Sequence, residues 1–207
     1  MKPLLLGLLS LPAAVLAQLD VNLNQQSDIW EIRHGATALP ATADSDGDGF
    51  LNPAESIAGT DPLDAHSFPK LDITAVAPGT LHLQWLGEAG KGYQLLGSPN
   101  LNAASFTLLD SVTGDGGWMT EIVTTGGSQA FFRLDALDID SDNDGLTNWE
   151  ELQIGFNPFL NHTDRNDTPD LTRVQNTLQA ASVLTVALID GDMREDWSDR
   201  GVVAIRR

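Results

Sequence analysis

The feature that most constrains this chain is a twelve-residue acidic segment that occurs twice. The two copies are DSDGDGFLNPAE, from Asp44 to Glu55, and DSDNDGLTNWEE, from Asp140 to Glu151. Each has Asp at positions 1, 3 and 5, Gly at 6, Asn at 9 and Glu at 12. Carboxylates packed this closely repel one another, or raise one another's pKa, unless a cation lies between them. We therefore expect each segment to be frayed without a cation and folded around one when it binds.

The spacing is the one that Ca²⁺ imposes on a short chain that surrounds it with oxygen atoms. Gly at position 6 permits the sharp turn, the carbonyl of position 7 points inward, Asn at 9 contacts the ion directly or through water, and Glu at 12 closes the far side. The candidate ligands are Asp44, Asp46, Asp48, Phe50, Asn52 and Glu55 in the first loop, and Asp140, Asp142, Asp144, Leu146, Asn148 and Glu151 in the second.

The donor atoms of the two loops indicate which metal they bind. Neither loop contains Cys or His, and ligands that are all oxygen favour Ca²⁺ over zinc or copper. Mg²⁺ is the weaker candidate because it prefers six ligands in a tight shell and keeps its water. We expect about two Ca²⁺ ions. The alternative is a pair of solvated acidic turns, which the recurrence of the full spacing disfavours.

The similarity between the copies extends beyond the loops, since each Glu is followed by Gly four residues on and by Pro seven residues on. DSDGDGFLNPAESIAGTDP and DSDNDGLTNWEELQIGFNP resemble the Cys-free bacterial form of thrombospondin type 3 repeats, and more distantly dockerin and EF-hand loops. A full EF-hand needs a longer incoming helix than residues 36–43, which Pro40 interrupts. The resemblance implies a structural, extracellular calcium site.

Between the loops the apolar period changes to two, which predicts β-strands. Six short strands separated by Pro-Gly, Gly-rich or Asn turns predict a mainly β fold, a small antiparallel β-sandwich flanked by two calcium-binding loop plus short-helix repeats. Trp85 is expected in its core and not as a sugar platform. The segment resembles immunoglobulin-like or fibronectin-type modules. The candidate strands are 71–76, 81–86, 93–97, 106–111, 119–124 and 130–134.

Short helices are expected beside the loops. Ser27 is a candidate N-cap for a helix over 28–34 that Gly35 ends, and helices over 53–58 and 149–154 follow the two loops. Residues 19–26 are polar and weakly patterned. A degenerate third site that uses Asp164, Asp167 and Asp170 is an open alternative, although it lacks the Gly.

The two ends of the chain predict export and a further module. Lys2 followed by an apolar run and Val15-Leu16-Ala17 predicts a signal peptide, so we expect a protein that is secreted, at the cell surface or periplasmic. Residues 171–181 predict a helix, and 183–189 and 202–206 predict strands. The last part resembles the opening of a Calx-beta module, which implies the N-terminal part of a longer protein or a truncated reading frame. The predicted domains are 1–17, 18–69, 70–137, 138–170 and 171–207.

Composition and missing motifs limit the function. The chain has 29 acidic and 11 basic residues, a formal net charge of −18, and no Cys, so it repels nucleic acid and is not stabilised by disulfides. No membrane-spanning segment is expected in the mature chain, and no catalytic motif is present, so we expect no enzyme. A calcium-stabilised spacer of a modular bacterial protein is the leading hypothesis.

Two alternatives stay open at this point. The first is a module that recognises an extracellular polysaccharide or protein through exposed tryptophans. The second is an accessory N-terminal region of a larger secreted enzyme. The candidate tryptophans are Trp118, Trp149 and Trp197.

Overall fold

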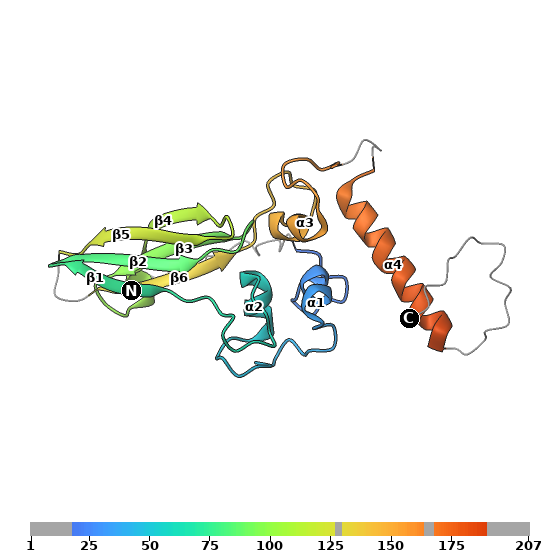
Figure 1. Cartoon of the computed structure of the whole chain (residues 1–207), viewed down its shortest axis with the longest axis horizontal. Helices are drawn as coiled ribbons and strands as arrows, with labels where there is room; N and C mark the ends of the chain where they lie inside the picture. The colour runs from blue at the N-terminus through green and yellow to red at the C-terminus, as the bar shows by residue number, and fades with distance from the viewer. Residues whose placement is uncertain (1–17, 127–129, 164–167, 190–207) are drawn as a thin grey trace, which may run out of the picture.

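The computed structural model describes residues 18–126, 130–163 and 168–189. Figure 1 shows the strands gathered at one end of the molecule, three short helices in the middle and a long helix beyond them. In chain order the elements are α1 (Asp28–His34), α2 (Asn52–Ala58), β1 (Asp72–Ala77), β2 (Thr80–Leu86), β3 (Gly92–Ser98), the 3₁₀ turn η1 (Ala103–Ser105), β4 (Thr107–Thr113), β5 (Trp118–Thr124), β6 (Phe131–Leu137), α3 (Asn148–Ile154) and α4 (Asp170–Ile189).

The six strands form two three-stranded antiparallel sheets, in the orders β1-β2-β5 and β4-β3-β6. This confirms the predicted mainly β class, and each of the six strands predicted between the two loops overlaps an observed one. The alternating residues of the central strands β2 and β3 face one another and form the core: Leu83, Trp85, Tyr93 and Leu95. The prediction that Trp85 is a core residue is confirmed, since its side chain is buried. The two sheets and the loops that connect their strands form the β module.

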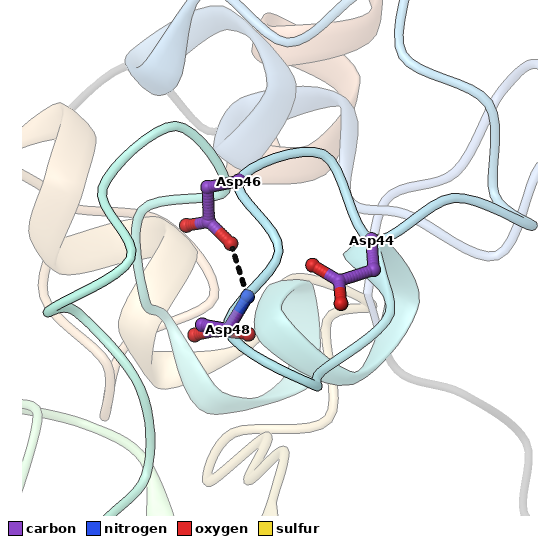
Figure 2. Close-up of side chains that lie close together, drawn as sticks. All are labelled: Asp44, Asp46 and Asp48. Carbon is purple, nitrogen blue, oxygen red and sulfur yellow. Dashed lines mark hydrogen bonds between the residues drawn. The ribbon is translucent and has the colours of Figure 1, made fainter.

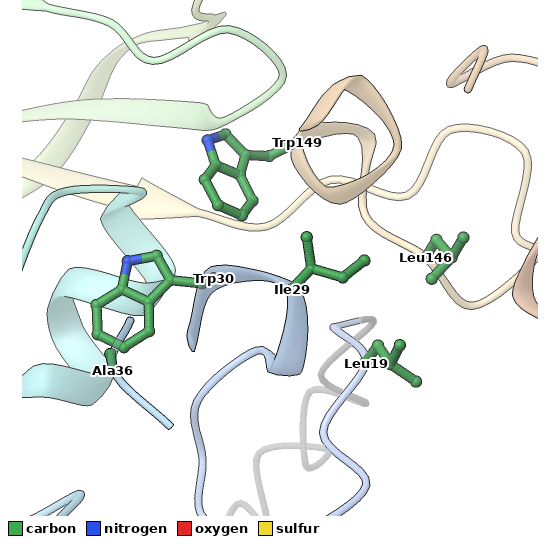
Figure 3. Packing of buried hydrophobic residues seen from close by; sticks show 6 residues of the cluster. All are labelled: Leu19, Ile29, Trp30, Ala36, Leu146 and Trp149. Carbon is green, nitrogen blue, oxygen red and sulfur yellow. The ribbon is translucent and has the colours of Figure 1, made fainter. Parts of the chain in front are cut away.

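A second core lies among the helices (Figure 3). It combines side chains from α1 and α3 with neighbours from the loops, namely Leu19, Ile29, Trp30, Ala36, Leu146 and Trp149. The indole N–H of Trp30 donates to the carbonyl of Thr60, at 2.7 Å, which connects α1 to the segment after α2. The two acidic loops and their helices thus pack into one unit. The chain enters and leaves the β module at the end that faces this unit (Figure 1).

Close packing explains one glycine that follows the first loop. Gly59 ends α2 with a φ of 80°, and a Cβ placed on it would lie 2.9 Å from the indole nitrogen of Trp149. A residue with a left-handed backbone conformation that lies against another helix has no room for a side chain, so it has to be glycine. The Gly four residues after the loop glutamate therefore has a packing role as well as a capping role in the first repeat.

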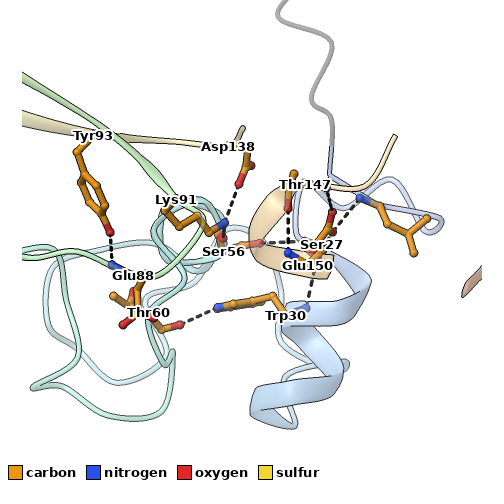
Figure 4. A network of polar contacts seen from close by, with 11 residues as sticks. Ser27, Trp30, Ser56, Thr60, Glu88, Lys91, Tyr93, Asp138, Thr147 and Glu150 are labelled. Carbon is orange, nitrogen blue, oxygen red and sulfur yellow. Dashed lines mark hydrogen bonds and ion pairs between the residues drawn. The ribbon is translucent and has the colours of Figure 1, made fainter. Parts of the chain in front are cut away.

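Buried polar groups join the three short helices (Figure 4). The carboxylate of Glu150 forms a capping box with Thr147 and also accepts from the Leu19 N–H, at 2.9 Å, and from the Ser27 hydroxyl. The Ser27 N–H in turn donates to the hydroxyl of Ser56 in α2, at 2.9 Å. Because Glu150 is fully buried and its donors come from different segments, losing any of them would leave a costly unpaired group.

The side chain of Lys91 connects the β module to this helical unit. This side chain is buried, and its Nζ lies 2.6 Å from Asp138 Oδ1 and 3.0 Å from the Ser56 carbonyl (Figure 4). The same Nζ lies 4.8 Å from the centre of the Trp149 ring. One ammonium group therefore contacts the exit of β6, helix α2 and helix α3. Removing one partner of a buried ion pair leaves an uncompensated buried charge, which strongly destabilises the folded protein.

The C-terminal prediction is partly wrong. A helix was expected over 171–181 and a strand over 183–189, but α4 continues from Asp170 to Ile189. Periodicity alone does not separate a short apolar run from a helical one, and no Gly or Pro interrupts the chain between 170 and 189. The predicted signal peptide and the strand over 202–206 lie outside the described residues. Within the described part, every helix is too short or too polar to traverse a bilayer.

Candidate metal centre

The first acidic loop brings its three aspartates together, with one oxygen from each of Asp44, Asp46 and Asp48 within 4.8 Å of the others (Figure 2). Two backbone N–H groups of the loop donate to the Asp44 carboxylate. The Gly47 N–H donates to Asp44 Oδ1 at 2.7 Å, and the Gly49 N–H donates to Asp44 Oδ2 at 3.0 Å. Both glycines have positive φ, 81° and 102°, which L side chains adopt with difficulty. The glycines therefore allow the chain to turn sharply enough to gather the carboxylates.

The next two aspartates each use one oxygen on the backbone. Asp46 Oδ1 accepts from the Asp48 N–H at 3.2 Å, and Asp48 Oδ1 accepts from the Phe50 N–H at 2.8 Å. Their Oδ2 atoms are buried and have no hydrogen-bond donor. Glu55, carried by α2, is fully buried, with one oxygen 3.5 Å from the Thr60 hydroxyl and the other without a donor.

The second loop repeats these bonds position by position. Asp140 accepts from the N–H groups of Asn143 and Gly145, Asp142 from that of Asp144, and Asp144 from that of Leu146. One oxygen each of Asp140, Asp142 and Asp144 lies within 4.8 Å of the others. Asp142 Oδ2, Asp144 Oδ2 and both oxygens of the fully buried Glu151 have no donor.

The two asparagines at position 9 begin their helices and close their loops. The backbone N–H of Asn52 donates to Ala43 O, and that of Asn148 to Ile139 O. The Asn148 side chain is also paired with Ser141, accepting from its N–H at 2.9 Å and donating to its hydroxyl at 2.8 Å. That both asparagines contact the ion, directly or through water, stays a prediction, as do the carbonyl ligands of Phe50 and Leu146.

The electrostatics of the loops favour a cation. Burial, followed by the charges of neighbouring aspartates, raises the pKa of Glu55 to about 7 and that of Glu151 to about 8. Burial also raises the pKa values of Asp142 and Asp144. Among the described residues, eight buried carboxylate oxygens have no hydrogen-bond donor, and seven of them belong to the two loops. Buried anionic oxygens are normally paired, so this all-oxygen donor set fits Ca²⁺.

Residues 20–31 form a third loop with the same backbone geometry, which was not predicted from the sequence. Leu23 and Gln25, at positions 4 and 6, have positive φ of 59° and 70°, as the residues at these positions do in the other loops. The N–H of Asp28 at position 9 donates to Leu19 O at 2.8 Å, the same contact that Asn52 and Asn148 make. A seven-residue helix follows in all three cases and ends at a left-handed glycine.

This third loop differs at positions 3 and 5, where it has Asn22 and Asn24. Their side-chain oxygens accept from backbone N–H groups as the aspartates do. Their amide nitrogens donate to Glu31 at position 12, at 3.2 and 2.8 Å, one to each oxygen. Two side-chain amide groups therefore donate to the buried Glu31. In the other two loops, oxygens of the glutamate at position 12 have no donor. The signal that would have revealed this copy is D-x-N-x-N, with Glu at 12 and Gly four residues later.

The position of Asp170 beside the second loop was not predicted from the sequence. Its partners in the predicted third site, Asp164 and Asp167, lie outside the described residues, so that site stays a prediction. One oxygen of Asp170 lies within 4.8 Å of oxygens from Asp144 and Glu151. Its backbone N–H donates to Asn161 O at 3.1 Å and its Oδ2 accepts from the Thr163 N–H at 2.8 Å. Asn148 makes the two corresponding bonds at position 9 of its own loop, to Ile139 and Ser141. Asp170 has the same spacing from Asn161 as Asn148 has from Ile139, and this spacing could have identified Asp170 from the sequence.

Comparison with known proteins identifies both predicted loops. A family model described as the bacterial TSP3 repeat matches residues 44–65 and 140–160. TSP3 repeats are structural repeats that bind calcium and are not enzymatic. The third loop, residues 20–31, lies outside the matched segments. No curated protein and no solved structure matches the chain.

Proposed function

We propose that this chain is an exported, calcium-stabilised structural segment that spaces or presents modules of a larger bacterial surface or secreted protein. The observation that carries the proposal is the set of seven unpaired, buried carboxylate oxygens in the two TSP3 repeats. Asp44, Asp46, Asp48 and Glu55 would hold one ion, and Asp140, Asp142, Asp144 and Glu151 the other. Bound Ca²⁺ would neutralise the charges that otherwise push these loops apart.

The contacts between modules support a role for calcium in rigidity. Lys91 of the β module touches Ser56 and Trp149, which lie one residue from Glu55 in α2 and two from Glu151 in α3. Fraying of either loop would therefore loosen the helix that carries these contacts. In this proposal the ions set the orientation of the β module, because they order both helices against which Lys91 packs.

Calcium removal tests the proposal. At 1 mM Ca²⁺ and a Kd of about 10⁻⁴ M, each site adds about 1.4 kcal/mol of stability. Two sites raise the Tm by about 6–12 °C for a chain of this size. Calorimetric titration should give two bound ions, and Asp46→Ala with Asp142→Ala should abolish them. Identical melting in chelator and in calcium, with no metal by elemental analysis, would refute the proposal.

Recognition of a polysaccharide or protein is the second candidate function, favoured by Trp118. This residue of β5 is 61% exposed, and an exposed indole suits stacking on a ligand. Trp149 does not serve this purpose because it is buried in the helical core, and Trp197 lies outside the described residues. Binding on a glycan array that is lost on Trp118→Ala, while the Tm is kept, would support recognition; a silent array with folded protein would contradict it.

Three finer assignments belong to the same proposal. Export to the cell surface, periplasm or medium is supported by the N-terminal sequence and by the structural type of the repeats. An immunoglobulin- or fibronectin-like β module is supported by the pairing of β2 with β5 and of β3 with β4 and β6. An accessory region of a larger secreted enzyme is the remaining alternative, and sequencing the gene downstream of codon 207 tests it.

A further inference from the structure

The second calcium loop has a carboxylate neighbour from outside the repeat. Asp170, the first residue of α4, offers an oxygen within 4.8 Å of oxygens from Asp144 and Glu151. Asp170 and Glu151 are fully buried. Among the described residues, no carboxylate from outside the first loop joins Asp44, Asp46 and Asp48 in this way. The two sites therefore differ in the charge that surrounds them.

Glu151 shows that this cluster needs a positive partner. Both of its oxygens are buried without a donor, and one of them lies within 4.8 Å of carboxylate oxygens from Asp144 and Asp170. The Asp170 oxygens accept one bond each, from the Thr163 N–H at 2.8 Å and from Arg173 Nη1 at 3.3 Å. A carboxylate has about four acceptor positions, so Asp170 retains capacity for an ion.

We propose that Asp170 is a further ligand of the Ca²⁺ in the second loop, so that one ion holds the repeat and the start of α4 together. This inference rests on the proposed calcium function. A shared ligand of this kind makes the position of α4 depend on calcium.

The packing of α4 gives this coupling a structural consequence. Leu171, Val174 and Leu178 lie against the core that contains Trp30 and Trp149. Next to the loop the fit is tight, since a Cβ on Gly145 would lie 3.0 Å from Leu171 Cδ2. An ion that holds Asp170 in place keeps this apolar side of α4 on the core, whereas its loss releases the first turn.

Calcium titration of the full chain tests the assignment. Asp170→Asn should leave the first site unchanged and weaken the second by about tenfold or more, because even partners outside the ligand shell contribute 10- to 100-fold. Asp110→Asn, in strand β4 and outside both loops, is the matched control for the lost charge and should leave both affinities unchanged. Two sites of unaltered affinity in Asp170→Asn would overturn the inference and leave the proposed function intact, whereas a wild-type protein that binds no Ca²⁺ would defeat both.

Terbium luminescence gives a readout of the ligands themselves. In an Asp46→Ala background, in which only the second loop is loaded, Tb³⁺ should gain about one bound water when Asp170→Ala, which leaves no side-chain oxygen, is added. Equal hydration in the two proteins would overturn the inference. So would a third bound ion in the wild type that disappears in Asp170→Asn, because it would mean two ions at this loop and not one.

A measurement on the wild type covers the case in which Asp170→Asn does not fold. Hydrogen exchange of the first α4 amides should slow when calcium is added, together with the amides of the second loop. Exchange in α4 that is unaffected while the loop becomes protected would overturn the inference.

Discussion

The variant Glu151→Gln tests two consequences of one negative charge. The charge helps to bind calcium, and it destabilises the fold when no metal is bound. Glu151 is fully buried and neither oxygen has a donor. Glutamine keeps its shape, removes its negative charge and adds an amide donor beside Asp144 and Asp170. In the third loop, amide groups already satisfy a buried glutamate in this manner. We therefore expect the variant to be more stable than the wild type in chelator and less responsive to calcium.

The magnitude follows from the raised pKa. The pKa of Glu151 moves from 4.5 to about 8, and each pKa unit corresponds to about 1.4 kcal/mol of differential interaction. Movement of the metal-free loop relieves part of this cost, so we expect glutamine to stabilise the protein in chelator at pH 8 by about 1–3 kcal/mol. This corresponds to a Tm rise of roughly 2–12 °C. Loss of one site should remove about 1.4 kcal/mol of the calcium effect, or about half of it.

The assay is thermal unfolding at pH 8 in chelator and in 1 mM Ca²⁺, for the wild type and two glutamine variants. Glu150→Gln is the matched control, because the adjacent glutamate is equally buried but its oxygens already accept from Leu19, Ser27 and Thr147. It should lower the Tm in both buffers and keep the calcium-induced rise. If Glu151→Gln lowers the Tm in chelator, or retains the full calcium response, the metal-site reasoning is refuted.

The two loop glutamates have folded-state pKa values of about 7 and about 8, raised above the unfolded value, so the metal-free protein loses stability as pH rises through them. Because calcium binds the ionised form, the calcium-induced Tm rise should grow from pH 5 to pH 8; a rise independent of pH would contradict this. Asn22→Asp with Asn24→Asp removes both amide donors of the third loop and adds like charges. It should lower the Tm in chelator and make that loss recoverable by calcium, whereas Asn22→Ala with Asn24→Ala should give a loss that calcium does not recover. Finally, Lys91→Met leaves Asp138 buried without its cation and should cost about 3–5 kcal/mol in denaturant unfolding; adding Asp138→Leu should restore part of it, and a variant as stable as the wild type would show that this contact does not fasten the module.

The third loop, residues 20–31, can be compared directly with the two acidic loops because all three lie in one chain. Positions 4, 6 and 9 have the same backbone geometry in all three, so the turn itself does not depend on which residues stand at positions 3 and 5. Those residues determine how the glutamate at position 12 is satisfied. We infer that Asp at positions 3 and 5 makes a loop depend on a cation, because it places anionic oxygens where Asn22 and Asn24 place donors.

The sequence by itself determined the two metal loops, the short helices and the six strands, because these depend on spacing within a few residues. The spacing of the loop carboxylates, the helix caps and the alternation of apolar residues are local features, and each depends on residues close together in the chain. The third loop was encoded in the same way, but its Asn residues concealed it. Only the tertiary structure placed both repeats at one end of the β module, buried Lys91 among three segments and brought Asp170 to Glu151. It also decided that residues 183–189 extend a helix. These outcomes depend on contacts between residues far apart in the chain, and local patterns carry no information about which distant surfaces meet.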